Sequence, residues 1–427
     1  MNTLLFKRRR QTLALIGAGL SAPALAQFRV EVSGVGLTQL PIVVAPFRGE
    51  EGAPQKISAI IRADLERSGQ LRGIDVPGLL VDESSRPDLA TLRQRGADAL
   101  TAGSVTRLAD GRWDIRFRLW DVVKGDDLSG QSYAVTAGDL RLAAHRIADY
   151  VYEKLTGERG VFSTRIAYVT RGTNRFNLWV ADADGENAQS ALASPEPIIS
   201  PAWAANGNQL AYVSFESRKP VVYVHEVASG RRRLLANFRG SNSAPAWAPD
   251  GRSLAVTLSR EGGSQLYLIS VEGGEPRRLI ESSGIDTEPV FSPDGRSIYF
   301  VSDRGGAPQV YRVSASGGTP ERVTFNGSYN ISPALSPDGK TLAYTSRVGS
   351  GFKLQVMDLA SGNATAITET TADESPSFAP NGKLIVYATR QGDQEALMTT
   401  TLDGRIKARL AGQGGDLREP DWGPFAR

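Results

Sequence analysis

Residues 245–257 read PAWAPDGRSLAVT, and this segment decides the fold because the chain repeats it. Residues 289–301 read PVFSPDGRSIYFV and residues 333–345 read PALSPDGKTLAYT, each 44 residues after the segment before. Six related segments follow one another at steps of 44 residues, with one step of 43. Such regular spacing is typical of a repeat architecture. The segments begin at Pro201, Pro245, Pro289, Pro333, Pro376 and Pro420.

Each of the first five copies contains the same succession of turns and strands. In the third copy, an Asp-Gly turn at 294–295 precedes an alternating strand at 298–301, a second strand at 310–313 and a short strand at 322–324. Asp-Gly and Asn-Gly turns beside alternating apolar segments indicate β-hairpins. With the Pro-x-Trp element as a further strand, each unit has four strands. This pattern is typical of a propeller blade and not of a helical repeat, which would show a period of 3.6.

The two ends of the repeat region complete one another. Residues 166–185 supply the second and third strands of a unit without a Pro-x-Trp element before them, and the last element, at Pro420, has no strands after it. Together the two fragments make one blade. Residues 163–427 therefore predict a six-bladed β-propeller that its own C-terminus closes, which removes the exposed sheet edges of an open array.

Ahead of the repeats, residues 27–160 alternate between helix patterns and strand patterns. This alternation predicts a small α/β domain. Ile57, Ile61 and Leu65 lie on one face of a helix that ends at Gly69. The fold class is therefore mainly β, with the propeller C-terminal to this domain. The other expected elements are a buried strand at 41–47, a helix at 88–95, strands at 100–108 and 113–123 joined by an Asp-Gly turn, and a helix from Leu140 that ends at Gly157.

The first 26 residues have the order of a secretory signal peptide. Four basic residues at 7–10 precede an apolar stretch at 12–20, and Ala24-Leu25-Ala26 forms an A-x-A cleavage site. Cleavage after Ala26 is expected. No later segment approaches about 18 apolar residues, so we expect an exported, periplasmic protein without membrane insertion. The Arg9-Arg10 pair leaves twin-arginine export open beside the general route.

Charge and cysteine content narrow the classes of partner. The signal segment holds four of the 49 basic residues and none of the 46 acidic ones, so the mature chain carries 45 against 46. Without a dense basic block, nucleic acid is not an expected partner. The chain has no cysteine, which suits an oxidising compartment.

Few residues offer catalytic or metal chemistry. The chain has two histidines, and His145 is placed on the polar side of its helix, in register with Arg141 and Asp149. His225 lies in a strand beside Glu226. Both histidines are interpreted as surface or structural residues, because zinc would need more nitrogen or sulfur ligands than they supply.

The recurring Ser-Pro-Asp-Gly segments invite comparison with the paired carboxylates of a glycosidase. Asp250, Asp294 and Asp338 occupy the same hairpin turn in successive units, where an Asp-Gly pair suits the backbone angles, so turn chemistry explains them. The chain contains no G-x-S-x-G elbow, Walker motif or dinucleotide fingerprint. The sequence therefore predicts no catalytic residue, no metal-ligating residue and no cofactor, and it leaves open whether a metal ion occupies the propeller channel.

An alternating strand stands at the expected mature N-terminus. Phe28, Val30 and Val32 alternate with polar residues in the segment 27–33. Such a strand can pair within its own domain or add to the sheet edge of a partner, and the residues alone leave both open.

The chain has a signal peptide, then an α/β domain and then the propeller repeats. In this order of features it resembles the TolB family, the periplasmic propeller proteins of the Tol-Pal envelope system. The resemblance covers essentially the whole chain and rests on residues 152–157 (YEKLTG), residues 164–169 (TRIAYV) and the repeat Pro-x-Trp/Phe/Leu-Ser/Ala-Pro-Asp/Asn-Gly. The first unit departs from the pattern with Ala205 at the second proline, units three to five lack the tryptophan, and the sixth unit lacks the Asp-Gly pair.

The resemblance implies a monomeric adaptor that catalyses nothing. Proteins of this family bind the Pal lipoprotein at the propeller mouth and TolA through the mature N-terminus. They support outer-membrane integrity and constriction during cell division, and some bacteriocins exploit them for import. The alternatives are a periplasmic propeller hydrolase, which would need a carboxylate or Ser/His cluster at the mouth, and a ligand-binding or purely structural propeller.

Repeat geometry and the resemblance together indicate site residues. The segment before each Pro-x-Trp element reaches the mouth of the central channel, so polar residues in that segment are expected to be exposed there. For Pal, the resemblance then implies contacts by Asn242, Ser243, Asp286, Thr287, Glu288, Asn330, Asp373 and Glu374. For TolA, it implies contacts by Phe28, Arg29, Val30, Glu31, Val32 and Ser33.

Overall fold

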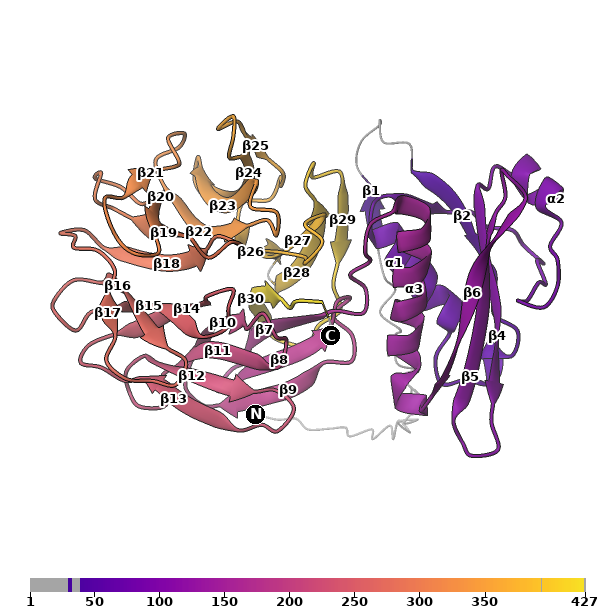
Figure 1. Cartoon of the computed structure of the whole chain (residues 1–427), viewed down its shortest axis with the longest axis horizontal. Coiled ribbons are helices and arrows are strands. Elements are labelled where there is room, and N and C mark those ends of the chain that lie inside the picture. Colours follow the sequence, from indigo (N-terminus) through magenta and orange to yellow (C-terminus); the bar gives the residue numbers. More distant parts are fainter. Residues whose placement is uncertain (1–29, 33–38, 393, 426–427) are drawn as a thin grey trace, which may run out of the picture.

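The computed structural model describes residues 30–32, 39–392 and 394–425, which form two parts that lie side by side (Figure 1). The N-terminal part is an α/β domain, and the C-terminal part is a ring of six β-sheets. The predicted fold class is therefore confirmed. The signal segment 1–26 lies outside the described residues. Among the helices of the described ranges, none combines the length and apolarity that a bilayer crossing requires.

A five-stranded sheet in the order β3-β2-β4-β5-β6 forms the base of the N-terminal domain. β2 lies between β3 and β4 in parallel pairing, and β4, β5 and β6 form antiparallel hairpins. The sequence pattern does not predict β3, which spans three residues, or β6, an edge strand with mostly exposed side chains. The strands are β2 (Leu40–Val44), β3 (Leu71–Gly73), β4 (Ala99–Arg107), β5 (Trp113–Asp121) and β6 (Asp126–Val135).

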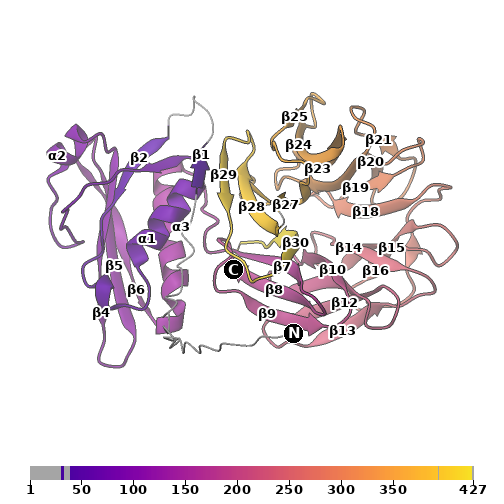
Figure 2. The ribbon, with the colours of Figure 1, turned by 180° about the vertical axis from the view of Figure 1, so that it is seen from behind.

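Two helices, α1 and α3, cover the face of this sheet that is turned toward the propeller (Figure 2). The predicted apolar stripes are their buried faces, since Ile57, Ile61, Leu65 and Ile147 are all fully buried in one cluster. α3 ends before Gly157, whose φ of 76° is the left-handed conformation that glycine favours. The helices are α1 (Ile57–Arg67), α2 (Leu89–Gln94) and α3 (Leu140–Thr156), with 3-10 turns at Glu50–Gly52 and Ala137–Asp139.

Six blades of four antiparallel strands form the propeller, and we number them along the chain from the first propeller strand. Blade 1 comprises β30 (Asp416–Trp422), β7 (Arg165–Arg171), β8 (Phe176–Asp182) and β9 (Gln189–Ser194). Blade 2 comprises β10 (Ile198–Trp203), β11 (Gln209–Ser214), β12 (Val221–Glu226) and β13 (Arg232–Ala236). Blade 3 comprises β14 (Asn242–Trp247), β15 (Ser253–Leu258), β16 (Gln265–Ser270) and β17 (Arg277–Arg278).

The remaining three blades follow the same plan, with the innermost strand first. Blade 4 comprises β18 (Asp286–Phe291), β19 (Ser297–Ser302), β20 (Gln309–Ser314) and β21 (Glu321–Arg322). Blade 5 comprises β22 (Asn330–Leu335), β23 (Thr341–Val348), β24 (Gly351–Asp358) and β25 (Ala364–Ala366). Blade 6 comprises β26 (Glu374–Phe378), β27 (Leu384–Gln391), β28 (Gln394–Thr401) and β29 (Ile406–Arg409), and β1 (Val30–Val32) joins it as a fifth strand.

The repeated Pro-Asp-Gly turn also connects neighbouring blades. In blade 4, Gly295 N donates to Ser292 O at 2.8 Å. Asp294 Oδ1 accepts from Arg296 N at 3.0 Å, which confirms that this aspartate serves the turn. Gly295 has a φ of 70°, and a Cβ atom there would lie 3.7 Å from Pro249 of blade 3. The proline and the glycine of the repeat therefore meet across the blade boundary.

Aromatic residues of the inner strands seal the same boundaries. Trp247 Nε1 donates to Ala202 O of the preceding blade at 3.0 Å, and Trp422 Nε1 donates to Thr164 Oγ1 at 2.8 Å. Both indoles are buried. These tryptophans therefore belong to the core between blades.

The ring closes between strands from opposite ends of the repeat region. β30 pairs antiparallel with β7, from Asp416 opposite Arg171 to Trp422 opposite Ile166. Trp422 packs in one buried cluster with Tyr168 of blade 1 and with residues of blade 6. The predicted closure by the C-terminus is confirmed.

Deletion of residues 419–427 should destabilise the propeller strongly, because blade 1 would lose half of its inner strand and the buried Trp422. Loss of a large buried side chain costs about 3–5 kcal/mol in well-packed cores, which is a large share of a domain's stability. Urea unfolding of the mature protein measures the change. A chain lacking only the last two residues is the control, and a 419–427 deletion that unfolds at the same urea concentration as the control would contradict the closure argument.

Candidate functional site

Each inner strand carries a β-bulge at the same place. In blade 4, the pairing of β18 with β19 shifts register between Thr287 and Val290. The residue before the proline has a positive φ in all six blades, although none of these residues is glycine. Left-handed backbone is strained for such residues, so the surrounding ring must hold it in place. The six residues are Ser200 (53°), Ala244 (46°), Glu288 (50°), Ser332 (51°), Ser375 (54°) and Glu419 (49°).

The six bulges surround a cavity of about 460 Å³ in the central channel. Residues of all six inner strands line it, including the proline of every repeat. The charged groups in its wall are mainly acidic. They are Glu288, Glu374, Glu419, Asp421 and Arg418.

Two of these carboxylates tie neighbouring blades together. Glu288 Oε2 of blade 4 accepts a hydrogen bond from Ser332 N of blade 5 at 2.6 Å. Glu419 of blade 1 accepts one from Ser200 N of blade 2. Burial raises the pKa of both carboxyl groups above the usual value, although the hydrogen bonds from the backbone oppose this change. Because the two glutamates are three blades apart in a ring of six, they lie on opposite sides of the channel.

Asp421 connects three blades at the seam of the ring. Its carboxylate accepts from Trp203 N of blade 2 at 2.7 Å and from Ser377 Oγ of blade 6 at 2.9 Å. Ser377 Oγ in turn accepts from Trp422 N at 2.9 Å. Burial raises the pKa of Asp421 to about 6, although both hydrogen bonds favour the charged form.

Four of the eight residues predicted to contact Pal are buried, so the expectation that they are exposed at the mouth is wrong. Their side chains instead hydrogen-bond within the loops that lead into the inner strands. Asn242 Nδ2 donates to Phe238 O at 3.0 Å, and Asp286 accepts two hydrogen bonds from Arg304. Asn and Asp are favoured in this position because they satisfy loop polar groups. The four residues are Asn242, Asp286, Asn330 and Asp373, each 0% exposed.

The other four predicted residues lie next to them and closer to the channel. Ser243 and Thr287 are partly exposed, and Glu374 is exposed. Glu288 faces the cavity, but its hydrogen bond to Ser332 also makes it part of the blade boundary, so replacing it would disturb the ring. The four buried residues therefore hold the loops at the mouth in place, whereas Ser243, Thr287 and Glu374 are accessible to a partner.

A rim of arginine and apolar side chains, not predicted from the sequence, lies along the mouth on blades 3 to 6. The start of each inner strand pairs with the end of the second strand, and an arginine stands at or just after that end in blades 3 to 6. Its recurrence in the repeat is the signal that could have found it. The arginines are Arg260, Arg304, Arg347 and Arg390. The exposed apolar residues of these loops are Ile285 (54%), Phe325 (69%) and Val348 (46%).

The N-terminal strand lies on the propeller. β1 pairs antiparallel with β29, from Val30 opposite Ala408 to Val32 opposite Ile406 (Figure 1). The sequence left open whether this strand pairs within its own domain or with a partner; in the structure it extends blade 6 of the same chain. Phe28, Arg29 and Ser33 lie outside the described residues.

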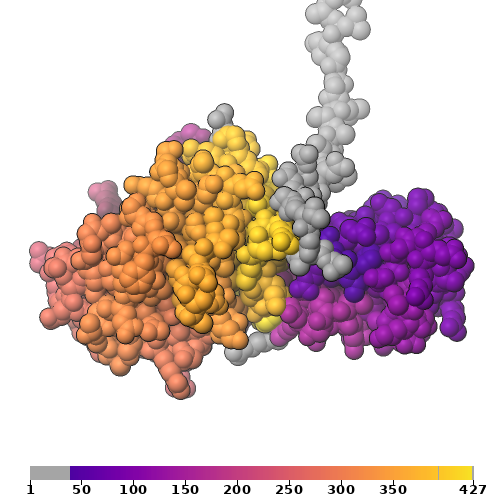
Figure 3. Space-filling view, turned by 90° about the horizontal axis from the view of Figure 1, so that it is seen from above, coloured from indigo at the N-terminus to yellow at the C-terminus, as the bar shows by residue number. Residues whose placement is uncertain are grey.

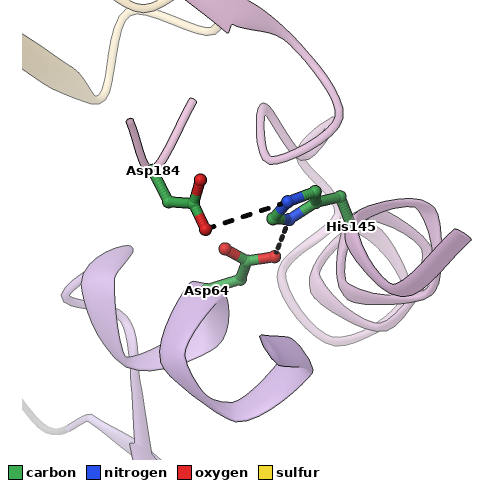
Figure 4. A group of neighbouring side chains, drawn as sticks. All are labelled: Asp64, His145 and Asp184. Carbon is green, nitrogen blue, oxygen red and sulfur yellow. Dashed lines mark hydrogen bonds and ion pairs between the residues drawn. The ribbon is translucent and has the colours of Figure 1, made fainter. Parts of the chain in front are cut away.

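Both histidines are buried, so of the two predicted interpretations the structural one holds and the surface one does not. His145 does lie on the polar side of α3, and that side faces Asp182 and Asp184 of blade 1. His225 lies with its ring 6.2 Å from that of Tyr212. Asp64, His145 and Asp184 offer ligand atoms within 4.8 Å of one another, a spacing that one metal ion could span (Figure 4). Arginines bind the same carboxylates, however, so their charge is already balanced.

Comparison with known proteins agrees with this architecture. Residues 152–426 match the TolB beta propeller domain, and residues 28–128 match the TolB amino-terminal domain. The chain is 75% identical over 419 residues to the Tol-Pal system protein TolB of a Polaromonas species, with 98% of each chain covered. It is 64% identical over 427 residues to the protein of the same name from Aromatoleum aromaticum, with 100% of each chain covered.

A solved structure shows the same arrangement. The crystal structure of TolB from Acinetobacter baumannii matches with a TM-score of 0.85 at 36% identity, and the match covers 93% of this chain and 100% of that chain. Both domain models and near-complete relatives therefore agree with the fold and with its closed ring. The chain belongs to the TolB family and is a component of the Tol-Pal system.

Proposed function

We propose that this protein is a non-enzymatic adaptor of the Tol-Pal system that acts in the periplasm after removal of residues 1–26. It binds the Pal lipoprotein at the propeller mouth and TolA through the mature N-terminus. In this role it would support outer-membrane integrity and constriction during cell division, and bacteriocins would use it for import. The observation that carries the proposal is the mouth itself, where partly exposed polar residues lie inside a rim of arginine and apolar side chains.

The chemistry of the mouth supports a protein partner. Arginine and exposed aromatic residues are enriched at protein interfaces, where they supply most of the binding energy. Phe325 is stacked under Arg322, with 5.2 Å between the guanidinium carbon and the ring centroid, so an apolar surface and a cation are presented together. Thr287 lies near the start of the inner strand β18, next to the cavity-lining Glu288, and is partly exposed.

The position of β1 supports a role for the N-terminus in strand addition. Its pairing with β29 involves only three residues and shows that the segment forms an edge strand. The backbone groups that bind β29 are those that would pair with a partner's sheet. TolA would therefore pair either with the open edge of β1 or, once β1 has left blade 6, with the backbone groups that now bind β29.

Replacement of Thr287 by tryptophan should weaken Pal binding by about 2 kcal/mol, or roughly thirtyfold, because the larger side chain would obstruct a close contact at the mouth. Thr287 is partly exposed, so the fold should persist. Calorimetry at fixed salt measures the affinity. Ser270→Trp is the matched control, because Ser270 is exposed at the other end of its blade, opposite Ser253. Unchanged affinity in a folded Thr287→Trp protein would place the Pal site elsewhere.

A protein that begins at Gly34 should lose TolA binding, while Pal binding remains intact or changes only modestly. Strand addition predicts the same loss for Val30→Pro, because proline lacks the backbone N–H that a β-ladder needs. Pull-down with purified TolA and Pal measures both contacts on the same sample. If the protein that begins at Gly34 retains TolA binding, the N-terminal site is refuted; if only Val30→Pro retains it, the residues bind in another conformation.

A further inference from the structure

Buried charge is also concentrated far from the mouth, where the N-terminal domain meets blade 1. Figure 3 shows the two parts of the molecule in contact, and the ion pair of Arg141 with Asp184 joins the N-terminal domain to blade 1. The charged side chains come from three elements: α1, α3 and the hairpin between β8 and β9. They are Asp64 and Arg67 of α1, Arg141 and His145 of α3, and Asp182 and Asp184 of the hairpin.

The central contact joins the two helices. His145 Nδ1 lies 2.6 Å from Asp64 Oδ2, and both side chains are 1% exposed (Figure 4). The other oxygen of Asp64 accepts from Arg67 Nη2 at 2.7 Å. This end of the cluster belongs entirely to the N-terminal domain.

The opposite end reaches the propeller. His145 Nε2 lies 3.8 Å from Asp182 Oδ2 and 3.9 Å from Asp184 Oδ2. Arg141 donates to Asp184 at 2.5 Å and lies 3.5 Å from Asp182. The imidazole therefore has a carboxylate of the N-terminal domain on one nitrogen and two carboxylates of blade 1 near the other, of which Figure 4 shows Asp184.

The protonated imidazole suits this position better than the neutral ring. Neutral histidine carries one N–H and one acceptor nitrogen, whereas the charged form carries N–H groups on both sides, and both nitrogens here face carboxylates. The charges also balance: three carboxylates face two guanidinium groups, and a charged His145 makes the sum zero. Loss of the proton would leave one unbalanced negative charge in a buried site, which is costly.

The other charged groups nearby do not alter this balance at the imidazole. Asp149, one turn further along α3, accepts from Phe162 N at 2.7 Å and from Ser163, and burial raises its pKa. Glu186 acts on Arg141 and Arg165 acts on Asp182, each through its charge, and these two opposite charges leave the sum unchanged. Burial lowers the pKa of His145, because it opposes the charged form. Asp64 and the two carboxylates of the hairpin favour the charged form more strongly, so the pKa is raised to about 10.

A metal ion is the competing explanation for Asp64, His145 and Asp184. A divalent ion on neutral His145 would give the cluster a net charge of +1, because Arg67 and Arg141 stay bound to the same carboxylates. The proton gives neutrality without displacing an arginine. The balance of charge in the cluster therefore favours a proton on His145 over a metal ion.

We propose that protonated His145 is a latch between the two domains, which joins Asp64 of α1 to Asp182 and Asp184 of blade 1 and loosens the domain boundary when its proton is lost. The latch is independent of the partners proposed above. It sets the orientation of the N-terminal domain on the propeller, and so the relative position of the two ends of the molecule.

The direction of the pH effect follows from the raised pKa. A histidine whose folded-state pKa exceeds its ordinary value of 6.5 stabilises the folded arrangement fully below about pH 6.5. This contribution declines as the pH rises through the folded-state pKa near 10. Between these limits, the equilibrium constant for latch closure should fall by up to about tenfold per pH unit.

Nuclear magnetic resonance of histidine-labelled protein tests the protonation state directly, because the chain contains only His145 and His225. We expect His145 to keep both ring protons beyond pH 8. His225 is the internal control, because burial and the charge of Arg232 lower its pKa. A His145 that is neutral at pH 7.5, or whose signals shift on addition of Zn²⁺ alone, would overturn the proposal, the second outcome in favour of a metal site.

A distance measurement tests the latch itself. The chain has no cysteine, so Gln94→Cys on the N-terminal domain and Ser270→Cys on the propeller, both exposed, can carry a unique pair of spin labels. We expect a narrow distance distribution at pH 7 that broadens between pH 8 and 10. His145→Gln should be broad at pH 7 and insensitive to pH, and the control His225→Gln should behave like the unsubstituted protein.

The result does not depend on one variant. If His145→Gln fails to fold, Asp184→Asn removes the propeller's side of the latch while retaining the histidine, and it should broaden the distribution at pH 7. A distribution that stays narrow from pH 7 to 10 in the unsubstituted protein would overturn the proposal by itself.

Discussion

Pairing of β30 with β7 is the contact on which the rest of the structure depends. The two strands come from opposite ends of the repeat region, and their pairing gives blade 1 its inner strand. Such distant pairing is opposed by chain entropy, so it persists only because it completes a ring of favourable contacts. In the closed ring, neighbouring blades meet at the repeated turns and at the inner-strand tryptophans, as Gly295 meets Pro249 and Trp247 meets Ala202.

Closure also explains how the channel can hold strained backbone and partly buried carboxylates. Glu288 and Glu419 are favoured in the wall because each accepts a backbone N–H that the bulge of the next blade presents. The hydrogen bond offsets part of the cost of burying the carboxylate, and it fixes the bulge in its left-handed conformation. A mouth held in this way is preorganised, so a partner would bind it without first having to order it.

The boundary between the domains is held by different forces. Blade boundaries are sealed mainly by apolar packing, supplemented by hydrogen bonds of channel carboxylates such as Asp421, whereas the contact of α1 and α3 with blade 1 depends strongly on a few buried charges around His145. Electrostatic contacts of this kind respond to protonation, and apolar packing does not. The molecule therefore combines a rigid propeller with a domain contact that a single proton can influence.

The sequence by itself determined the number of blades, their strands and turns, and the way in which the ring closes. These features depend on local patterns, namely the 44-residue period, the Asp-Gly turns and the alternation of apolar residues. Because the patterns recur from repeat to repeat, the prediction rests on several independent copies. The main helices were likewise evident from their apolar stripes, such as Ile57, Ile61 and Leu65. Only tertiary structure decided the burial of Asn242 and Asp286 and of His145, as well as the docking of β1 on blade 6. A polar residue on a loop or helix looks the same in sequence whether it faces water or another part of the chain, and its surroundings are set by contacts with residues far away in sequence.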